Sequence, residues 1–90
     1  MDSHHNMVEY KAEIINLTVM AEDRSVVICR VRRHTLFGKI MMKYSQQVGI
    51  PVNLLLFRFD GESINETDRP FMLGLEEGDM IEVYRQQTAG

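Results

Sequence analysis

Cys29 and His34 are the residues whose types could together form a catalytic site. A cysteine thiolate attacks carbonyl carbon when a histidine within hydrogen-bond reach takes its proton. Cys29 lies on a predicted strand, whereas His34 lies beyond the end of that strand, near the start of a predicted helix. The two side chains are therefore not expected to meet, and the sequence predicts no nucleophilic catalysis.

Asp2, His4 and His5 are the remaining candidates, as ligands of a metal ion. Ligands on a mobile chain end bind a metal weakly, and nothing nearby completes a tetrahedral set. The sequence also contains no glycine-rich phosphate-binding loop. We therefore expect a protein that is not an enzyme and that holds no metal and no cofactor.

The charged residues are placed unevenly along the chain. Its net charge is -3, yet residues 24–59 contain no acidic residue. The basic residues of this segment are Arg24, Arg30, Arg32, Arg33, Lys39, Lys43 and Arg58. The acidic residues that follow it are Asp60, Glu62, Glu66, Asp68, Glu76, Glu77, Asp79 and Glu82. The pattern predicts a basic face and an acidic face, which suits two kinds of protein partner.

Nucleic-acid binding is the alternative interpretation of the basic segment. It would predict a complex that weakens steeply with salt. The net negative charge and the lack of aromatic residues interleaved with the basic ones argue against it.

The length and composition favour one small soluble domain. Ninety residues, 44% of them hydrophobic, are enough for a single core. No apolar run reaches the ~18 to 20 residues of a membrane-spanning helix, and the first residues lack the pattern of a signal peptide. One cysteine cannot form an internal disulfide, which fits a reducing compartment. We expect a monomer of the nucleus and cytoplasm that does not associate with membranes.

Alternating apolar and polar residues predict a β-hairpin at the start of the domain. Residues 15–19 form its first strand, residues 21–25 break the alternation as a turn, and residues 26–32 form its second strand. One face of the second strand carries Val27, Cys29 and Val31, and the other carries Ile28, Arg30 and Arg32.

A helix is predicted next, capped by Thr35 and ended by Gly49. Pro51 cannot continue it. Its apolar stripe, spaced by three and four residues, consists of Leu36, Phe37, Ile40, Met41, Tyr44 and Val48.

The rest of the domain is predicted to complete a sheet. Residues 54–59 form a mostly buried strand before a tight turn at Asp60-Gly61, and Ile64 begins a short strand. Residues 71–73 make a helical turn, and residues 80–84 form the last strand. The order hairpin, helix, strand, short strand, strand predicts an α+β fold, the β-grasp, in which a mixed four- to five-stranded sheet packs on one main helix.

This domain is predicted to span residues 14–85. Residues 1–13 show no periodic spacing of apolar residues, and residues 86–90 contain no large apolar residue that could anchor them to the domain. Neither segment can bury enough surface to offset the entropy that it would lose on becoming ordered. Both ends are therefore predicted to be flexible tails.

Five segments resemble the small ubiquitin-like modifier (SUMO) family in the same order and at the same spacing. They are residues 15–19 with 22–23, 30–35, 57–61, 74–79 and 81–88. The last is the most specific, because a strand ending in Ile-Glu-Val-Tyr before a Gln-rich tail and a terminal glycine separates SUMO from ubiquitin. The resemblance covers nearly the whole domain and implies a ubiquitin-like fold.

The resemblance also implies a chemistry for the C-terminus. In this family the terminal glycine carboxylate is activated with ATP by an activating enzyme, and it is passed to a conjugating enzyme and, with ligases, to a target lysine. A SUMO protease processes the tail. Gly90 would be the reactive residue, but Ala89 stands where the family has a second glycine. Ala89 leaves open a non-covalent interaction domain that is not conjugated.

A second implied surface is a groove between the second strand and the helix, which in this family takes an extended apolar peptide with acidic flanks, the SUMO-interacting motif. Its matching residues are Val27, Cys29, Arg30, Val31, Arg32, Lys39, Ile40 and Lys43. Cys29 stands where the family has a bulky aromatic. The other interpretation is that the apolar residues are core and the cations a solvated face.

A third implied surface meets the conjugating enzyme. Its matching acidic residues are Asp23, Asp60, Glu76, Glu77 and Asp79, although acidic loops can also serve only solubility. Lys11, within Tyr10-Lys11-Ala12-Glu13, partly matches the Lys-x-Glu pattern that the family's machinery modifies and is a candidate chain acceptor.

Overall fold

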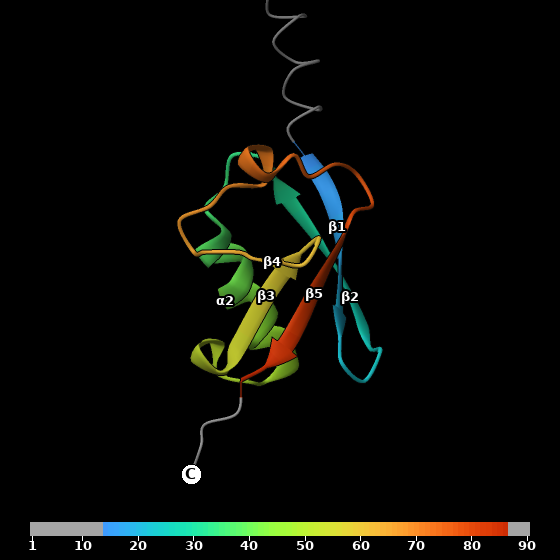
Figure 1. Ribbon diagram of the computed structural model, residues 1–90, viewed down its shortest axis with the longest axis vertical. Coiled ribbons are helices and arrows are strands. Elements are labelled where there is room, and N and C mark those ends of the chain that lie inside the picture. The colour runs from blue at the N-terminus through green and yellow to red at the C-terminus, as the bar shows by residue number, and fades with distance from the viewer. Residues whose placement is uncertain (1–13, 87–90) are drawn as a thin grey trace, which may run out of the picture.

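The computed structural model describes residues 14–86. Its elements in chain order are β1 (Ile14–Ala21), β2 (Val26–Arg32), α2 (Phe37–Val48), η1 (Val52–Leu54), β3 (Leu55–Phe59), β4 (Glu62–Ser63), η2 (Pro70–Leu73) and β5 (Met80–Arg85), where η marks a short 3-10 helix. The strands form one five-stranded sheet, and α2 lies across one face of it (Figure 1). This is the arrangement predicted for a β-grasp fold.

The sheet has the strand order β2-β1-β5-β3-β4. β1 and β5, the first and last strands of the described residues, pair in parallel at its centre, from Thr18 opposite Met80 to Ala21 opposite Val83. The pairs β1–β2, β3–β5 and β3–β4 are antiparallel. β2 is therefore one edge of the sheet, and β4 is the other.

The core lies between the sheet and α2. Alternate residues of the central strands, such as Leu17 and Ile81, point to this side and are buried with Phe37 of the helix. Tyr44 of α2 meets Phe57 of β3 edge to face, with ring centroids 5.7 Å apart. Each fully buried side chain of this size stabilises the fold by about 1.5 to 3 kcal/mol, so this layer holds the helix on the sheet.

The start of α2 differs from the prediction. Thr35 is not its cap, because the N-cap residue is Leu36, in an extended conformation and without a side-chain hydrogen bond. The first helical amides are instead satisfied by the loop after β4: Phe37 N–H donates to Asp68 O at 2.7 Å and Gly38 N–H to Glu66 O at 2.9 Å. This close approach explains Gly38, since a Cβ there would lie 3.3 Å from the Glu66 Cβ.

The end of α2 agrees with the prediction. Gly49 has φ 76°, in the left-handed region, and its N–H donates to Ser45 O at 2.9 Å. Asp60 and Gly61 also have positive φ, 57° and 84°, as the predicted tight turn between β3 and β4 requires.

Several element limits shift by one or two residues. β1 is longer than the predicted strand and includes Ala21, which had been assigned to the turn. Leu54 belongs to η1, so β3 begins at Leu55. The short strand ends at Ser63, and Ile64 follows it as a buried residue outside the ladder. Among residues 14–86, no helix is long and apolar enough to cross a bilayer.

Replacing Leu17 should test the dependence of the fold on this core. Leu17 is fully buried, whereas Leu56, on the opposite face of the sheet, is 39% exposed. We expect Leu17→Ala to lower the free energy of unfolding by about 3 kcal/mol because it leaves a cavity, and Leu56→Ala by less than about 1 kcal/mol. Urea unfolding followed by circular dichroism measures both, and equal losses would contradict this description of the core.

Candidate interaction surfaces

The outer edge of β2 offers free backbone hydrogen-bonding groups. Ala21 N–H donates to Ser25 O at 2.9 Å, so Ala21 and Ser25 form a hydrogen-bonded pair next to the hairpin turn. Since bonded and non-bonded pairs alternate along antiparallel strands, Val27, Cys29 and Val31 bond to β1. The N–H and C=O groups of the residues between them then point away from β1. Among residues 14–86, no strand pairs with that edge.

The apolar residues predicted for the groove lie between β2 and α2, and most of them are buried. Cys29, Val31 and Ile40 belong to the core, and Val27 is partly buried. Of the predicted groove, the backbone edge of β2 and the residues that flank it are therefore the accessible parts. Burial raises the pKa of the Cys29 thiol, and the nearby Lys43 ammonium opposes that rise.

The four predicted groove cations are exposed on both sides of this groove. Arg30 and Arg32 project from β2, while Lys39 and Lys43 project from α2. These four basic residues thus lie on the two elements that border the β2 edge, whereas Arg58, also predicted for the basic face, lies on β3 opposite Glu82.

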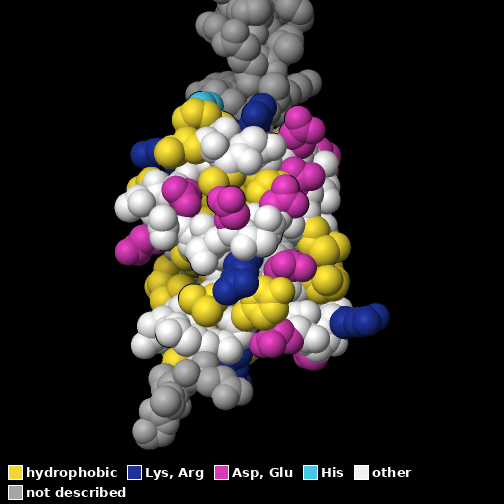
Figure 2. Space-filling model, viewed as in Figure 1, with side chains coloured by type: hydrophobic (Ala, Val, Ile, Leu, Met, Phe, Trp, Pro, Cys, Tyr) yellow, Lys and Arg dark blue, Asp and Glu magenta, His cyan; other side chains and the backbone are white. Residues whose placement is uncertain are grey.

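Four of the five predicted acidic residues lie at the end of the sheet where β5 begins and β3 ends. Glu76, Glu77 and Asp79 belong to the loop before β5, and Asp60 is in the turn after β3. Figure 2 shows acidic side chains gathered over this end of the sheet. A basic partner surface would therefore be attracted to this end.

Two of these carboxylates also hold the loop in place. Glu77 accepts hydrogen bonds from Asn16 N–H at 2.9 Å and from Asn16 Nδ2 at 3.1 Å. These bonds hold the pKa of Glu77 below its usual value, the backbone bond contributing most. The Asp79 carboxylate accepts the Glu76 N–H at 2.8 Å. The Glu76 side chain is exposed, and it is the backbone of Glu76 that takes part in the hydrogen bonds of this loop.

Asp23 does not join this group. It lies in the turn between β1 and β2, at the other end of an eight-residue strand that spans about 25 Å. Its carboxylate accepts hydrogen bonds from the side chain and the backbone N–H of Ser25, which lower its pKa. The structure therefore separates Asp23 from the other four acidic residues, and its clear role is to order the turn.

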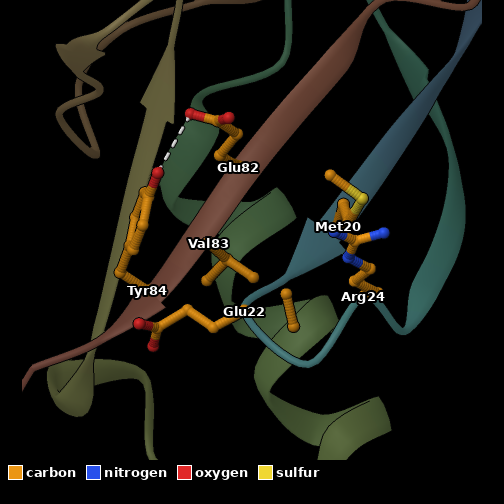
Figure 3. A pocket seen from close by; sticks show the side chains of 7 residues that line it. Met20, Glu22, Arg24, Glu82, Val83 and Tyr84 are labelled. Atoms are coloured by element: carbon orange, nitrogen blue, oxygen red, sulfur yellow. Dashed lines mark hydrogen bonds between the residues drawn. The ribbon is translucent and has the colours of Figure 1, made fainter.

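A hollow of about 340 Å³ lies near the end of β5 (Figure 3). Tyr84 O–H donates to Glu82 Oε1 at 3.2 Å, and the Glu82 charge raises the pKa of Tyr84. The Arg58 guanidinium lies 5.4 Å from the centre of the Tyr84 ring. At the same end, Glu22 accepts the Arg85 N–H at 3.0 Å and so fixes the backbone where it leaves the sheet.

Another hollow, on the outer side of α2, was missed by the sequence analysis. It measures about 510 Å³ and is lined by Leu36, Gly38, Lys39, Met42, Lys43, Gln46, Glu66 and Thr67. Met42 was the available signal, because it is an apolar residue outside the apolar stripe of the helix. Glu66 and Thr67 come from a loop whose position the sequence did not reveal.

Some predicted residues lie outside the described residues 14–86. They are the candidate acceptor Lys11, the tail residues Ala89 and Gly90, and the weak metal candidates Asp2, His4 and His5. Within residues 14–86, no group of three or more His, Cys, Asp or Glu side chains is placed to hold a metal ion.

Sequence comparison identifies the family. A family profile described as "Ubiquitin-2 like Rad60 SUMO-like" matches residues 15–84, which is most of the chain. The chain belongs to this SUMO-like family. The family predicted from the five sequence segments is therefore confirmed.

The chain is similar to small ubiquitin-related modifiers of vertebrates. It is 43% identical to Small ubiquitin-related modifier 3 of Danio rerio over 83 residues, which cover 92% of this chain and 88% of the relative. It is 46% identical to Small ubiquitin-related modifier 2 of Homo sapiens over 76 residues, covering 84% and 80%. Both relatives are modifiers rather than enzymes, so the prediction of a non-catalytic protein is confirmed through the family.

Solved structures confirm the fold of the SUMO-like domain. The ubiquitin of Caldiarchaeum subterraneum superposes with a TM-score of 0.77 at 15% identity, covering 86% of this chain and 99% of its own. The N-terminal ubiquitin-like domain of the 4931431F19Rik protein gives a TM-score of 0.76 at 15% identity, covering 88% and 81%. The ubiquitin-like β-grasp is therefore the fold of this domain.

The Glu77 hydrogen bonds predict how stability depends on pH. A carboxylate whose pKa is lowered by folding stabilises the fold above its unfolded pKa, and this contribution is lost as pH falls through the folded pKa. We expect Glu77→Gln to flatten the loss of thermal stability between about pH 5 and pH 3. Glu76→Gln, the matched control in the same loop, should keep the original slope. A Glu77→Gln profile that parallels the unmodified protein would contradict the assignment.

Proposed function

We propose that this SUMO-like protein is a modifier that becomes covalently attached to lysines of target proteins through the carboxylate of Gly90. The observation that carries the proposal is its 43% identity to Small ubiquitin-related modifier 3 over 92% of the chain. In this proposal an activating enzyme, a conjugating enzyme and ligases act on the tail, and a SUMO protease reverses the attachment.

The anchoring of β5 supports the proposal physically. Arg85 N–H donates to Glu22, and Gln86 N–H donates to Leu54 O at 2.6 Å. These two bonds fix the chain up to the last described residue. The point on the domain from which the conjugation tail departs is therefore fixed.

The acidic end of the sheet is the proposed surface for the conjugating enzyme. Asp60, Glu76, Glu77 and Asp79 lie there, about one strand length from the end of β5 where the tail begins. Charges exposed on a rim chiefly increase the rate of association with an oppositely charged partner. This surface would therefore hold the enzyme body while the tail reaches its catalytic cysteine.

The edge of β2 is the proposed reading surface for SUMO-interacting-motif peptides. An extended peptide can add a strand to an exposed edge, with backbone hydrogen bonds supplying affinity. The cations Arg30, Arg32, Lys39 and Lys43 flank this edge and would attract acidic residues of the peptide. Because Cys29, Val31 and Ile40 are buried, we propose that the peptide rests on them from outside rather than inserting deeply.

A non-covalent interaction domain is the second candidate function, and Ala89 is the residue that favours it. Glycine reaches backbone angles that a residue with a Cβ reaches only with strain, which suits a tail that threads a narrow enzyme channel. Ala89 would slow activation or removal if the channel needs those angles. The same β2 edge would serve this second function without conjugation.

Thioester formation decides between the two functions. Incubated with SUMO-activating enzyme, conjugating enzyme and ATP, the chain should form a reductant-sensitive thioester, and deletion of Gly90 should abolish it. Ala89→Gly should increase the rate, because it gives the tail the pair of glycines that the family carries. Failure of the unmodified chain to form the thioester, when Ala89→Gly forms it, would support the non-covalent function.

Charge reversal tests the β2 edge separately. Arg32→Glu combined with Lys39→Glu should weaken binding of an aliphatic peptide with an acidic flank by about tenfold or more, through lost attraction and added repulsion. Arg24→Glu, in the turn at the far end of β2, is the matched control and should bind nearly as the unmodified protein does. Titration calorimetry at low salt measures all three, and unchanged binding by the double variant would remove this assignment.

A further inference from the structure

The hollow on the outer side of α2 has the features of a binding site for one apolar side chain. Its volume of about 510 Å³ exceeds that of a single aliphatic or aromatic residue. Leu36 and Met42 line it and are 37% and 48% exposed, although neither is needed to hold the helix on the sheet. Methionine adapts its shape readily to a partner side chain.

The charged residues around this hollow differ in sign from one side of α2 to the other. At 100° per residue, Lys39 and Lys43 fall on the side of α2 that faces β2, whereas Gly38 and Met42 fall on the side that faces the loop after β4. Glu66, which contacts Gly38, lies on that far side. A ligand that crosses α2 from β2 would therefore meet two cations first, then the apolar residues, and an acid last.

We propose that the hollow takes an apolar anchor residue of the same peptide that binds the β2 edge, placed beyond its acidic flank. The proposal rests on the proposed reading of SUMO-interacting-motif peptides by that edge. The occupant is an extended segment with an aliphatic core, about three acidic residues and then a leucine or similar residue. The acidic residues pass Lys39 and Lys43, and the anchor contacts Leu36 and Met42.

The dimensions fit this path. An α-helix with its side chains is about 10 to 12 Å across, and three extended residues span about 10 Å. From the last core residue to an anchor that follows three acidic residues there are four steps, which span about 13 Å and are long enough to cross α2. The cations at the entrance disfavour a second copy of this chain as the occupant, because its own β2 edge carries Arg30 and Arg32.

The test compares two synthetic peptides that differ in one residue. Each has a core of four Val and Ile residues and three aspartates, followed by either leucine or serine. Both are made with the flank before and after the core, and the order that binds more tightly is used. Met42→Gln is the test variant, and Met72→Gln is its matched control, since Met72 is 58% exposed on η2, outside the hollow.

We expect the leucine peptide to bind the unmodified protein about fivefold more tightly than the serine peptide, as partial burial of one aliphatic side chain allows. Met42→Gln should abolish this difference while leaving the affinity for the serine peptide unchanged, which also shows that the variant is folded. Met72→Gln should keep the difference. Calorimetry or fluorescence anisotropy measures each affinity.

The contrary outcomes separate the two proposals. Equal binding of both peptides to the unmodified protein would overturn the anchor site while leaving the β2 edge as a peptide reader. A leucine advantage that persists in Met42→Gln would also overturn it, because the anchor would then bind elsewhere. Binding of neither peptide would overturn the reading function itself and the anchor site with it.

Discussion

The parallel pairing of β1 with β5 is the constraint on which the rest of this structure depends. It joins the first and last described strands at the centre of the sheet, where Leu17 and Ile81 are buried under α2. Once the centre is occupied in this way, the hairpin must place β2 at one edge and β3 with β4 beyond the other side. The open edge at β2 and the point where the described chain leaves the sheet both follow from this pairing.

The residues predicted for the groove combine burial with an open sheet edge. The interpretation of Val27, Val31 and Ile40 as core agrees with the burial of Val31 and Ile40, whereas Val27 is only partly buried. β2, which carries Cys29 and Val31, is nevertheless an edge strand, and its outward backbone groups and flanking cations stay exposed. In such a groove the core supplies a fixed apolar floor, while the backbone edge and the cations supply the contacts that a partner can gain.

The sequence predicted what depends on neighbouring residues and missed what depends on distant ones. The alternation in β2, the Gly49 cap and the Asp60-Gly61 turn are local patterns, and the structure contains all three. The start of α2 was wrong because its amides are satisfied by carbonyls of Glu66 and Asp68, about 30 positions later in the chain. The hollow beside Met42 was missed for the same reason, since that loop forms its far wall.

The acidic surface shows why a matching residue type does not by itself establish a role in binding. Asp23 and Glu77 match family positions, yet each carboxylate accepts two hydrogen bonds that order its own turn or loop. Removing either charge would change local structure as well as the field that a partner meets. Glu76 contributes its backbone to the loop and leaves its carboxylate exposed, so its removal isolates the electrostatic contribution to binding more cleanly than removal of Asp23 or Glu77.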